Sequence, residues 1–280
     1  MTSFNLGLDP PPDRDNPGHK PEISNVPYPV NTFYFDVTFG HIESQVKFML
    51  IKEYRTTNYD TAIATLHNIM NHLLKIGKFD CGVFLPSVLE IGNNMCLYQM
   101  EDRVINFERI VKRKIPFTRL LSSDKYEFKE MVDNFYRSCV ALTIFDYILG
   151  TKDRKACNIW ITPTGHVLRL ICDTVFDYGS YSNIPEVFIT SEFAKIKELE
   201  LHVPKFIDLV QSGFCILRNN FHFLIEAIRV MFGDVEGVDF YGKLPEITKV
   251  FMLDKSEEDI KNWFSVIIEN SVKSDLLYKA

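Results

Sequence analysis

Several short motifs that mark common enzyme classes are absent from this 280-residue sequence. It has no G-x-G-x-x-G, no G-x-x-x-x-G-K-[ST] and no G-x-S-x-G, which argues against a dinucleotide loop, a P-loop and a hydrolase nucleophile elbow. Its seven histidines include no H-x-x-x-H pair and no cysteine neighbours at zinc spacing, which argues against a zinc centre. His67 and His72 fall on one predicted helix, and we expect both at the surface.

Positive charge, paired cysteines and long apolar runs are also scarce. The formal net charge is −6, whereas non-specific nucleic-acid binders usually have a basic face, so no nucleic-acid partner is expected. The six cysteines are scattered without a C-x-x-C pair, which indicates reduced thiols and a cytoplasmic protein. No apolar run reaches the roughly 18 residues of a membrane span, and no early segment resembles a signal peptide. Any membrane contact would therefore be peripheral.

The sequence begins with residues 1–30, which are rich in Pro, Asp and Asn and predict a flexible tail. After the tail, the pattern predicts two strands, a helix and two more strands. The strands are aromatic or β-branched runs bounded by turn signals, and the helix has apolar residues at helical spacing. These elements are expected at 31–39, 45–54, 58–77, 82–92 and 95–100.

The character of the sequence changes near residue 101, after which helical patterns dominate. A long helix and two short strands are expected at 127–150, 158–163 and 166–173. Near the end of the chain, Ser256 and Asp259 form a capping box that predicts a helix start. The fold class is therefore α+β, with a small β-rich lobe over 31–101 and a larger helical lobe over 102–280.

Four polar residues fall where these elements end. Lys52 ends a predicted strand, Asp153 and Asn158 follow the long helix, and Asp173 ends another strand. Phosphoryl transfer uses these residue types: Lys neutralises phosphates, Asp and Asn oxygens hold magnesium, and a further Asp orients the attacking hydroxyl. The D-x-x-x-x-N pattern alone is expected about once by chance in such a chain. Chance much more rarely gives the complete order, in which a strand ending in Lys is followed by a helix, two strands, a second helix, D-x-x-x-x-N and a strand ending in Asp.

With these residues in place, the sequence resembles the catalytic domain of phosphoinositide 3- and 4-kinases, from about residue 33 to about residue 273. The likeness is in five stretches, and the last two contribute most because chance explains them poorly. The stretches are LIKEYRTTNYDTAIATLHNIMNHLL, FLPSVLEIGNNMCLYQME, YILGTKDRKACNIWITPTGHVLRLICD, IPEVFITSEF and FMLDKSEEDIKNWF. The resemblance implies a bilobal, protein-kinase-like fold.

The resemblance also implies roles for the residues on the small lobe. Lys52 matches the lysine that binds the ATP phosphates, and Asp60 matches an aspartate that organises the inner pocket. Gln99, Met100 and Glu101 match the connection that passes beneath adenine, where backbone groups make the contacts.

The catalytic loop of the family matches Asp153 to Asn158. Asp153 falls on the catalytic aspartate, Asn158 on one magnesium ligand and Asp173 on the other, the aspartate of D-F-G. A second interpretation takes Asp177-Tyr178-Gly179 as the D-F-G, and we prefer Asp173 because it ends the strand. Lys155 stands where the family has a catalytic histidine. A lysine there supplies a fixed charge but is a poor base at its usual pKa.

Two other departures concern the segment that follows Asp173. Val175 stands where D-F-G has its glycine, and the stretch from Asp173 to Ile184 contains no Lys or Arg, although basic residues suit an inositol phosphate headgroup. The leading expectation is an ATP- and magnesium-dependent kinase of a phosphoinositide hydroxyl at a membrane surface, with regulation by a separate protein chain left open. Three alternatives stay open: a pseudokinase that binds nucleotide or another protein, a protein kinase of the same superfamily, and a helical-core protein without a site.

Overall fold

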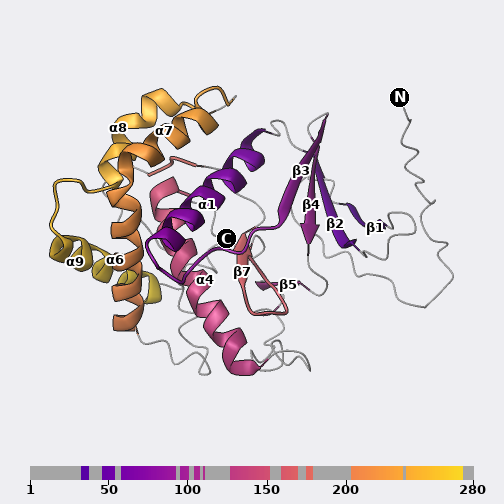
Figure 1. Ribbon diagram of the computed structural model, residues 1–280, viewed down its shortest axis with the longest axis horizontal. Coiled ribbons are helices and arrows are strands. Elements are labelled where there is room, and N and C mark those ends of the chain that lie inside the picture. The colour runs from indigo at the N-terminus through magenta and orange to yellow at the C-terminus, as the bar shows by residue number, and fades with distance from the viewer. Residues whose placement is uncertain are drawn as a thin grey trace.

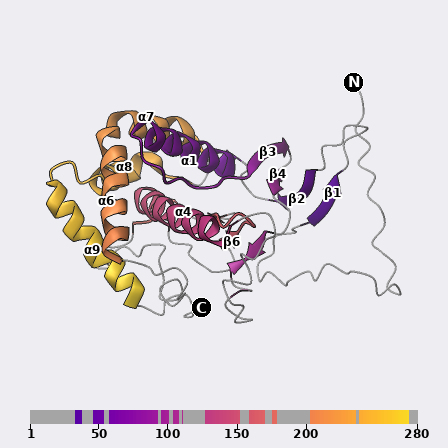
Figure 2. The same cartoon turned by 60° about the horizontal axis from the view of Figure 1, so that its bottom comes forward.

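The computed structural model describes residues 33–37, 46–53, 58–92, 95–100, 104–107, 110, 127–151, 159–169, 175–178, 203–235 and 238–273. Strands from the first hundred residues gather at one end of the molecule, and most helices lie at the other (Figures 1 and 2). The described part is mostly helical with a small antiparallel sheet. The division into lobes at residues 101 and 102 stays a prediction.

A four-stranded antiparallel sheet contains β1 (Phe33–Val37), β2 (Val46–Glu53), β3 (Ser87–Gly92) and β4 (Met95–Met100) in the order β1-β2-β4-β3. The predicted hairpin is confirmed, because Phe33 pairs with Ile51 in antiparallel register. The strand expected over 82–92 begins only at Ser87. Its first part pairs elsewhere, since the Asn71 side chain donates to the Val83 carbonyl oxygen and accepts from the Val83 amide, both at 2.9 Å.

Helix α1 (Asn58–Ile76) matches the predicted helix within one residue. Its apolar face is buried at 0–8% exposure through residues spaced three and four apart, as an amphipathic helix requires. The buried residues of this face are Ile63, Leu66, Met70, Leu73 and Leu74. His67 belongs to the same face at 7% exposure, so its predicted surface position is wrong, whereas His72 is exposed as expected.

Helix α4 (Phe128–Leu149) is the central element, and every residue from Ser138 to Leu149 is buried. It ends at Gly150, whose φ of 59° lies in the left-handed region that favours glycine. Beside it, β5 (Ile105–Asn106), β6 (Ile159–Ile161) and β7 (Val167–Arg169) form a second antiparallel sheet. The β6–β7 turn needs Gly165, because φ is 89° and an added Cβ would clash with the carbonyl oxygen of Met131.

The remaining described helices are α6 (Val203–Asn219), α7 (Phe221–Phe232), α8 (Phe240–Val250) and α9 (Glu257–Lys273). Sequence periodicity runs unbroken through α6 and α7, yet the structure separates them at Asn220. The capping box is confirmed: the Asp259 amide donates to Ser256 Oγ at 3.1 Å, and the Ser256 amide donates to Asp259 Oδ2 at 3.2 Å. Within the described part of the chain, every helix is too short or too polar to cross a bilayer.

One hydrophobic core joins α1, α4 and the C-terminal helices. Aromatic rings meet edge to face in it: Tyr147 of α4 lies 5.7 Å from Phe214 of α6 and 5.0 Å from Phe264 of α9. Cys81 and Cys139 are buried free thiols, and burial raises the pKa of Cys81 to about 12. The core fixes α1 and α4, which carry the residues considered next.

Candidate functional site

The structure describes the backbone at four of the predicted ATP-binding residues. Lys52 is the next-to-last residue of β2 and pairs with Cys96 of β4. Gln99 and Met100 end β4, opposite Met49 and Phe48. Asp60 is the third residue of α1. The two strands that carry Lys52 and the Gln99–Met100 pair are therefore direct neighbours in one sheet.

The other predicted site residues lie outside the described residues. They are Glu101, Asp153, Lys155, Asn158 and Asp173. The structure does describe the residues that flank the two segments with Asp153, Lys155, Asn158 and Asp173. Thr151 and Ile159 flank 152–158, and Arg169 and Val175 flank 170–174. The structure therefore informs this part of the candidate site through the arrangement of the flanking residues.

The chain returns to the end of α4 immediately after residue 174. The Phe176 amide donates to the Leu149 carbonyl oxygen at 2.6 Å, and the Asp177 amide donates to the Gly150 carbonyl oxygen at 3.1 Å. The Tyr178 hydroxyl donates to the Ile148 carbonyl oxygen at 2.7 Å. The residues that follow 170–174 are therefore bonded to the turn that precedes 152–158, at the end of α4.

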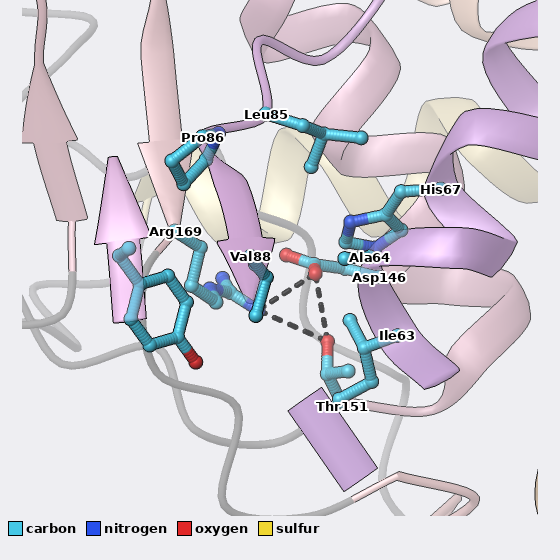
Figure 3. Close-up of a pocket in the computed structure, with 10 residues that line it drawn as sticks. Ile63, Ala64, His67, Leu85, Pro86, Val88, Asp146, Thr151 and Arg169 are labelled. Atoms are coloured by element: carbon cyan, nitrogen blue, oxygen red, sulfur yellow. Dashed lines mark hydrogen bonds and ion pairs between the residues drawn. The ribbon is translucent and has the colours of Figure 1, made fainter. Parts of the chain in front are cut away.

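A buried ion pair links the starts of the same two segments. Arg169 Nη1 lies 2.6 Å from Asp146 Oδ1, and each side chain is only 3% exposed. The Thr151 hydroxyl donates to Asp146 Oδ1 at 2.8 Å and accepts from Arg169 Nη1 at 3.1 Å. Figure 3 shows this triangle between the end of α4 and β7. The sequence analysis assigned no role to these three residues.

His67 lies above this ion pair on α1 (Figure 3). Its ring centroid is 5.2 Å from that of Phe145. The pKa of His67 is lowered to about 3, first by burial and in smaller part by the positive charge of Arg169. The imidazole is therefore neutral at physiological pH and adds no charge to the pair of Asp146 and Arg169.

A small cavity separates α1 from the ion pair. About 30 Å³ of it is open to the centres of water molecules, which is room for very few waters and not for a nucleotide. Its walls come from α1, α4, β3, β4, β7 and the connections beside them. The lining residues are Ile63, Ala64, His67, Leu85, Pro86, Val88, Tyr98, Asp146, Thr151 and Arg169.

Asp177, the alternative metal ligand, follows a residue that packs on α7 and α8. The neighbouring Phe176 is 1% exposed and packs on Phe232 and Phe240 at centroid distances of 5.2 and 6.4 Å. The pKa of Lys243 on α8 is raised, first by its hydrogen bond to Glu246 and in smaller part by the charge of Asp177. Asp177 thus belongs to the surroundings of α8.

The described segments bring no three His, Cys, Asp or Glu side chains together as metal ligands. The predicted magnesium ligands, Asn158 and Asp173, lie outside those segments. Their amide and carboxylate oxygens are the hard donors that magnesium prefers. The donor chemistry fits the ion, and magnesium bound there would neutralise charge on the phosphates of a nucleotide.

Known proteins similar to this chain are lipid kinases. The phosphatidylinositol 3-kinase piki-1 of Caenorhabditis elegans is 32% identical over 169 residues, which cover 55% of this chain and 10% of that protein. The phosphatidylinositol 3-kinase VPS34 of Candida glabrata is 24% identical over 230 residues, 77% of this chain and 25% of that protein. The phosphatidylinositol 4-kinase stt4 of Schizosaccharomyces pombe is 26% identical over 171 residues, 58% of this chain and 9% of that protein.

No protein-family model matches the chain. The similarity nevertheless extends across both 3- and 4-kinases of phosphatidylinositol. The chain is a distant homologue of the catalytic regions of the phosphoinositide 3- and 4-kinase family, as its motifs indicate. The matched regions span 9–25% of the length of these relatives, so the activities of the whole relatives are not transferred with the homology.

Proposed function

We propose that the chain is an ATP- and magnesium-dependent phosphotransferase that transfers the γ-phosphate of ATP to a phosphoinositide hydroxyl. The observation that carries the proposal is the homology, since the relatives named above are all phosphatidylinositol 3- or 4-kinases. Phosphoinositides lie at membrane surfaces, so the proposal includes peripheral membrane contact.

The pairing of β2 with β4 supports the proposal that a nucleotide binds between the adenine contact at Met100 and the phosphate contact at Lys52. Lys52 is four residues along β2 from Phe48, the residue opposite Met100. At about 3.3 Å per residue, this places the two contacts roughly 13 Å apart along the sheet. That separation is on the scale of an extended nucleoside triphosphate, with its base under Gln99–Glu101 and its phosphates near Lys52.

In this mechanism each residue has one task. Lys52 neutralises the phosphates and Asp60 organises the inner pocket. Asn158 and Asp173 hold magnesium, while Asp153 orients the acceptor hydroxyl and accepts its proton. Lys155 adds a fixed positive charge near the γ-phosphate. The hydrogen bonds of Phe176 and Asp177 to the end of α4 support this assignment, because they bring the residues after 170–174 to the turn that precedes 152–158.

A second candidate is a pseudokinase that binds nucleotide without transferring phosphate. The observation that favours it is the replacement of the family histidine by Lys155, together with the absence of Lys and Arg from 173–184. Both changes affect chemistry or headgroup binding and leave the proposed nucleotide contacts in place. The homology alone does not separate the two candidates.

The first experiment measures nucleotide binding by the whole chain. Thermal unfolding with and without millimolar Mg·ATP should show stabilisation of about 2.7 kcal/mol when ATP is at 100 times its dissociation constant. Lys52→Met should reduce that stabilisation, whereas Lys47→Met, at another lysine of β2, should retain it. Absence of any shift in the wild type would end the proposals of a phosphotransferase and of a nucleotide-binding pseudokinase, and would leave a pseudokinase that binds another protein.

The second experiment separates the candidates by product. Radiolabelled ATP is offered with vesicles of mixed phosphoinositides and, separately, with a generic protein substrate. Label in lipid that disappears with Asp153→Asn supports the proposed function. Label in protein alone indicates a protein kinase, and nucleotide binding without any transfer indicates a pseudokinase.

A further inference from the structure

Three segments of the chain meet at one carboxylate. Asp146 lies in the last turn of α4, Thr151 directly follows that helix and its cap, and Arg169 ends β7. Asp146 Oδ1 accepts from both the Thr151 hydroxyl and the Arg169 guanidinium, at 2.8 and 2.6 Å. The third side of the triangle is the 3.1 Å hydrogen bond from Arg169 to Thr151.

The two partners of Asp146 stand at the starts of the two segments proposed to carry the chemistry. Thr151 is two residues before Asp153, and Arg169 is four residues before Asp173. A change in the position of either partner moves the start of the following segment. One buried carboxylate thus sets the distance between those two starting points.

The surroundings make this triangle a rigid one. Ile63 and Ala64 of α1 cover it from one side, and Leu85 and Val88 cover it from another (Figure 3). Its three side chains are at most 3% exposed, so its hydrogen bonds act in a medium of low dielectric, where they are strong and directional. His67 is neutral there and adds no charge to the ion pair.

Net stability is a poor explanation for such a pair. Two charges lose their hydration on burial, and well-packed apolar residues of similar volume often give equal or greater stability. What an apolar pair lacks is direction, whereas the ion pair and the hydroxyl orient Thr151 relative to Arg169. The expected consequence of the triangle is therefore orientation of the two segments.

We propose that Asp146 and Arg169 are positioning residues that act through Thr151 and through the end of β7. They touch neither substrate nor nucleotide, and they set the relative placement of Asp153 and Asp173. This inference rests on the proposed function for its catalytic consequence. The tie between Thr151 and Arg169 itself can be tested without nucleotide.

The test uses variants that keep the fold. Thr151→Val replaces the hydroxyl by a methyl group of similar size, and Thr151→Ser keeps the hydroxyl without the methyl group. Replacing Asp146 by Leu and Arg169 by Met together removes the charges while retaining apolar packing, whereas a single change would leave a buried charge unpaired. The matched control is Ser138→Ala, because Ser138 is also buried on α4 and bonds β7, accepting from the Val167 amide at 2.9 Å.

Hydrogen exchange of the whole chain without nucleotide is the first measurement. We expect Thr151→Val to raise exchange about five- to tenfold in the peptides that contain 151–159 and 169–176, as loss of one buried hydrogen bond would. Thr151→Ser should restore the wild-type rates, and Ser138→Ala should leave these peptides unchanged. An equal rise in all core peptides, or full exchange of both segments already in the wild type, would overturn the proposal.

Kinetics is the second measurement, applied if the wild type transfers phosphate. A positioning role predicts that the double variant lowers kcat at least tenfold while KM for ATP changes less than threefold. An equal loss of kcat in Ser138→Ala would overturn the positioning role of Asp146 and Arg169. If the wild type binds no Mg·ATP, the proposed function fails, whereas the exchange experiment still decides whether Asp146 ties the two segments together.

Discussion

The ring of Tyr178 lies so close to Gly150 that a Cβ atom added to this glycine would stand 2.6 Å from Tyr178 Cε1. Gly150 also has φ of 59°, which only glycine adopts without strain. The contact joins the residue that caps α4 to the segment that returns after residue 174. Two independent physical effects, the backbone conformation and the steric contact, therefore restrict this position to glycine.

We expect Gly150→Ala to destabilise the protein by about 2–4 kcal/mol, from the left-handed conformation and from overpacking together. Chemical denaturation measures the loss. In a Tyr178→Ala background the same change should cost less, since the ring is gone while the backbone strain remains. Gly82→Ala is the control, because its nearest contact is 3.1 Å away at a side chain. A Gly150→Ala loss no greater than that of the control would contradict the packing described here.

His67 gives the stability a specific dependence on pH. Its pKa is about 3 in the folded chain, against 6.5 for an ordinary histidine, so the unfolded chain binds a proton between these values while the folded chain does not. Stability is complete above pH 6.5 and falls as pH decreases toward 3. Between pH 7 and pH 5 the loss from this residue is at most about 2 kcal/mol.

Denaturant unfolding at a series of pH values tests this expectation. His67→Phe retains a ring beside Phe145 and should flatten the decline between pH 7 and pH 5. His72→Gln changes an exposed histidine of the same helix and should leave the decline as it is in the wild type. Equal slopes in His67→Phe and the wild type would show that the burial of His67 does not control the pH dependence.

Local patterns were sufficient to predict most of the described elements. The helix expected over 58–77 ends one residue earlier, at Ile76. The Ser256–Asp259 capping box was predicted because its hydrogen bonds join residues only three apart. The shortened β3 was not predictable in this way, since the side chain that binds Val83 belongs to Asn71, on the preceding helix.

The burial of His67 was available in the sequence and was overlooked. His67 is four residues after Ile63 and three before Met70, so it occupies the apolar face of its helix. The ion pair left a weaker signal. Asp146 and Arg169 each interrupt an otherwise apolar run, which suggests buried charge, but their pairing depends on how β7 packs on α4. No local pattern contains that information.

The choice between Asp173 and Asp177 as metal ligand leads to a direct prediction. If Asp173 is the ligand, Asp173→Asn should abolish the magnesium dependence of ATP binding, and Asp177→Asn should retain it. The contacts of the Asp177 region with the turn after α4 and with α8 support this expectation. Calorimetric titration of ATP with and without magnesium gives the readout. The opposite pattern would assign the metal to Asp177 and place the D-F-G equivalent at residues 177–179.

Substitution of Lys155 tests most directly whether this chain can transfer phosphate. An imidazole with a pKa near 6.5 can exchange a proton at neutral pH, whereas a lysine with a pKa near 10.4 remains charged. We therefore expect Lys155→His to raise the rate of phosphate transfer while the dissociation constant of Mg·ATP changes little. Lys152→His is the matched control, since it introduces the same residue near the start of the segment. Loss of activity in Lys155→His alone would show that the lysine has a catalytic role of its own.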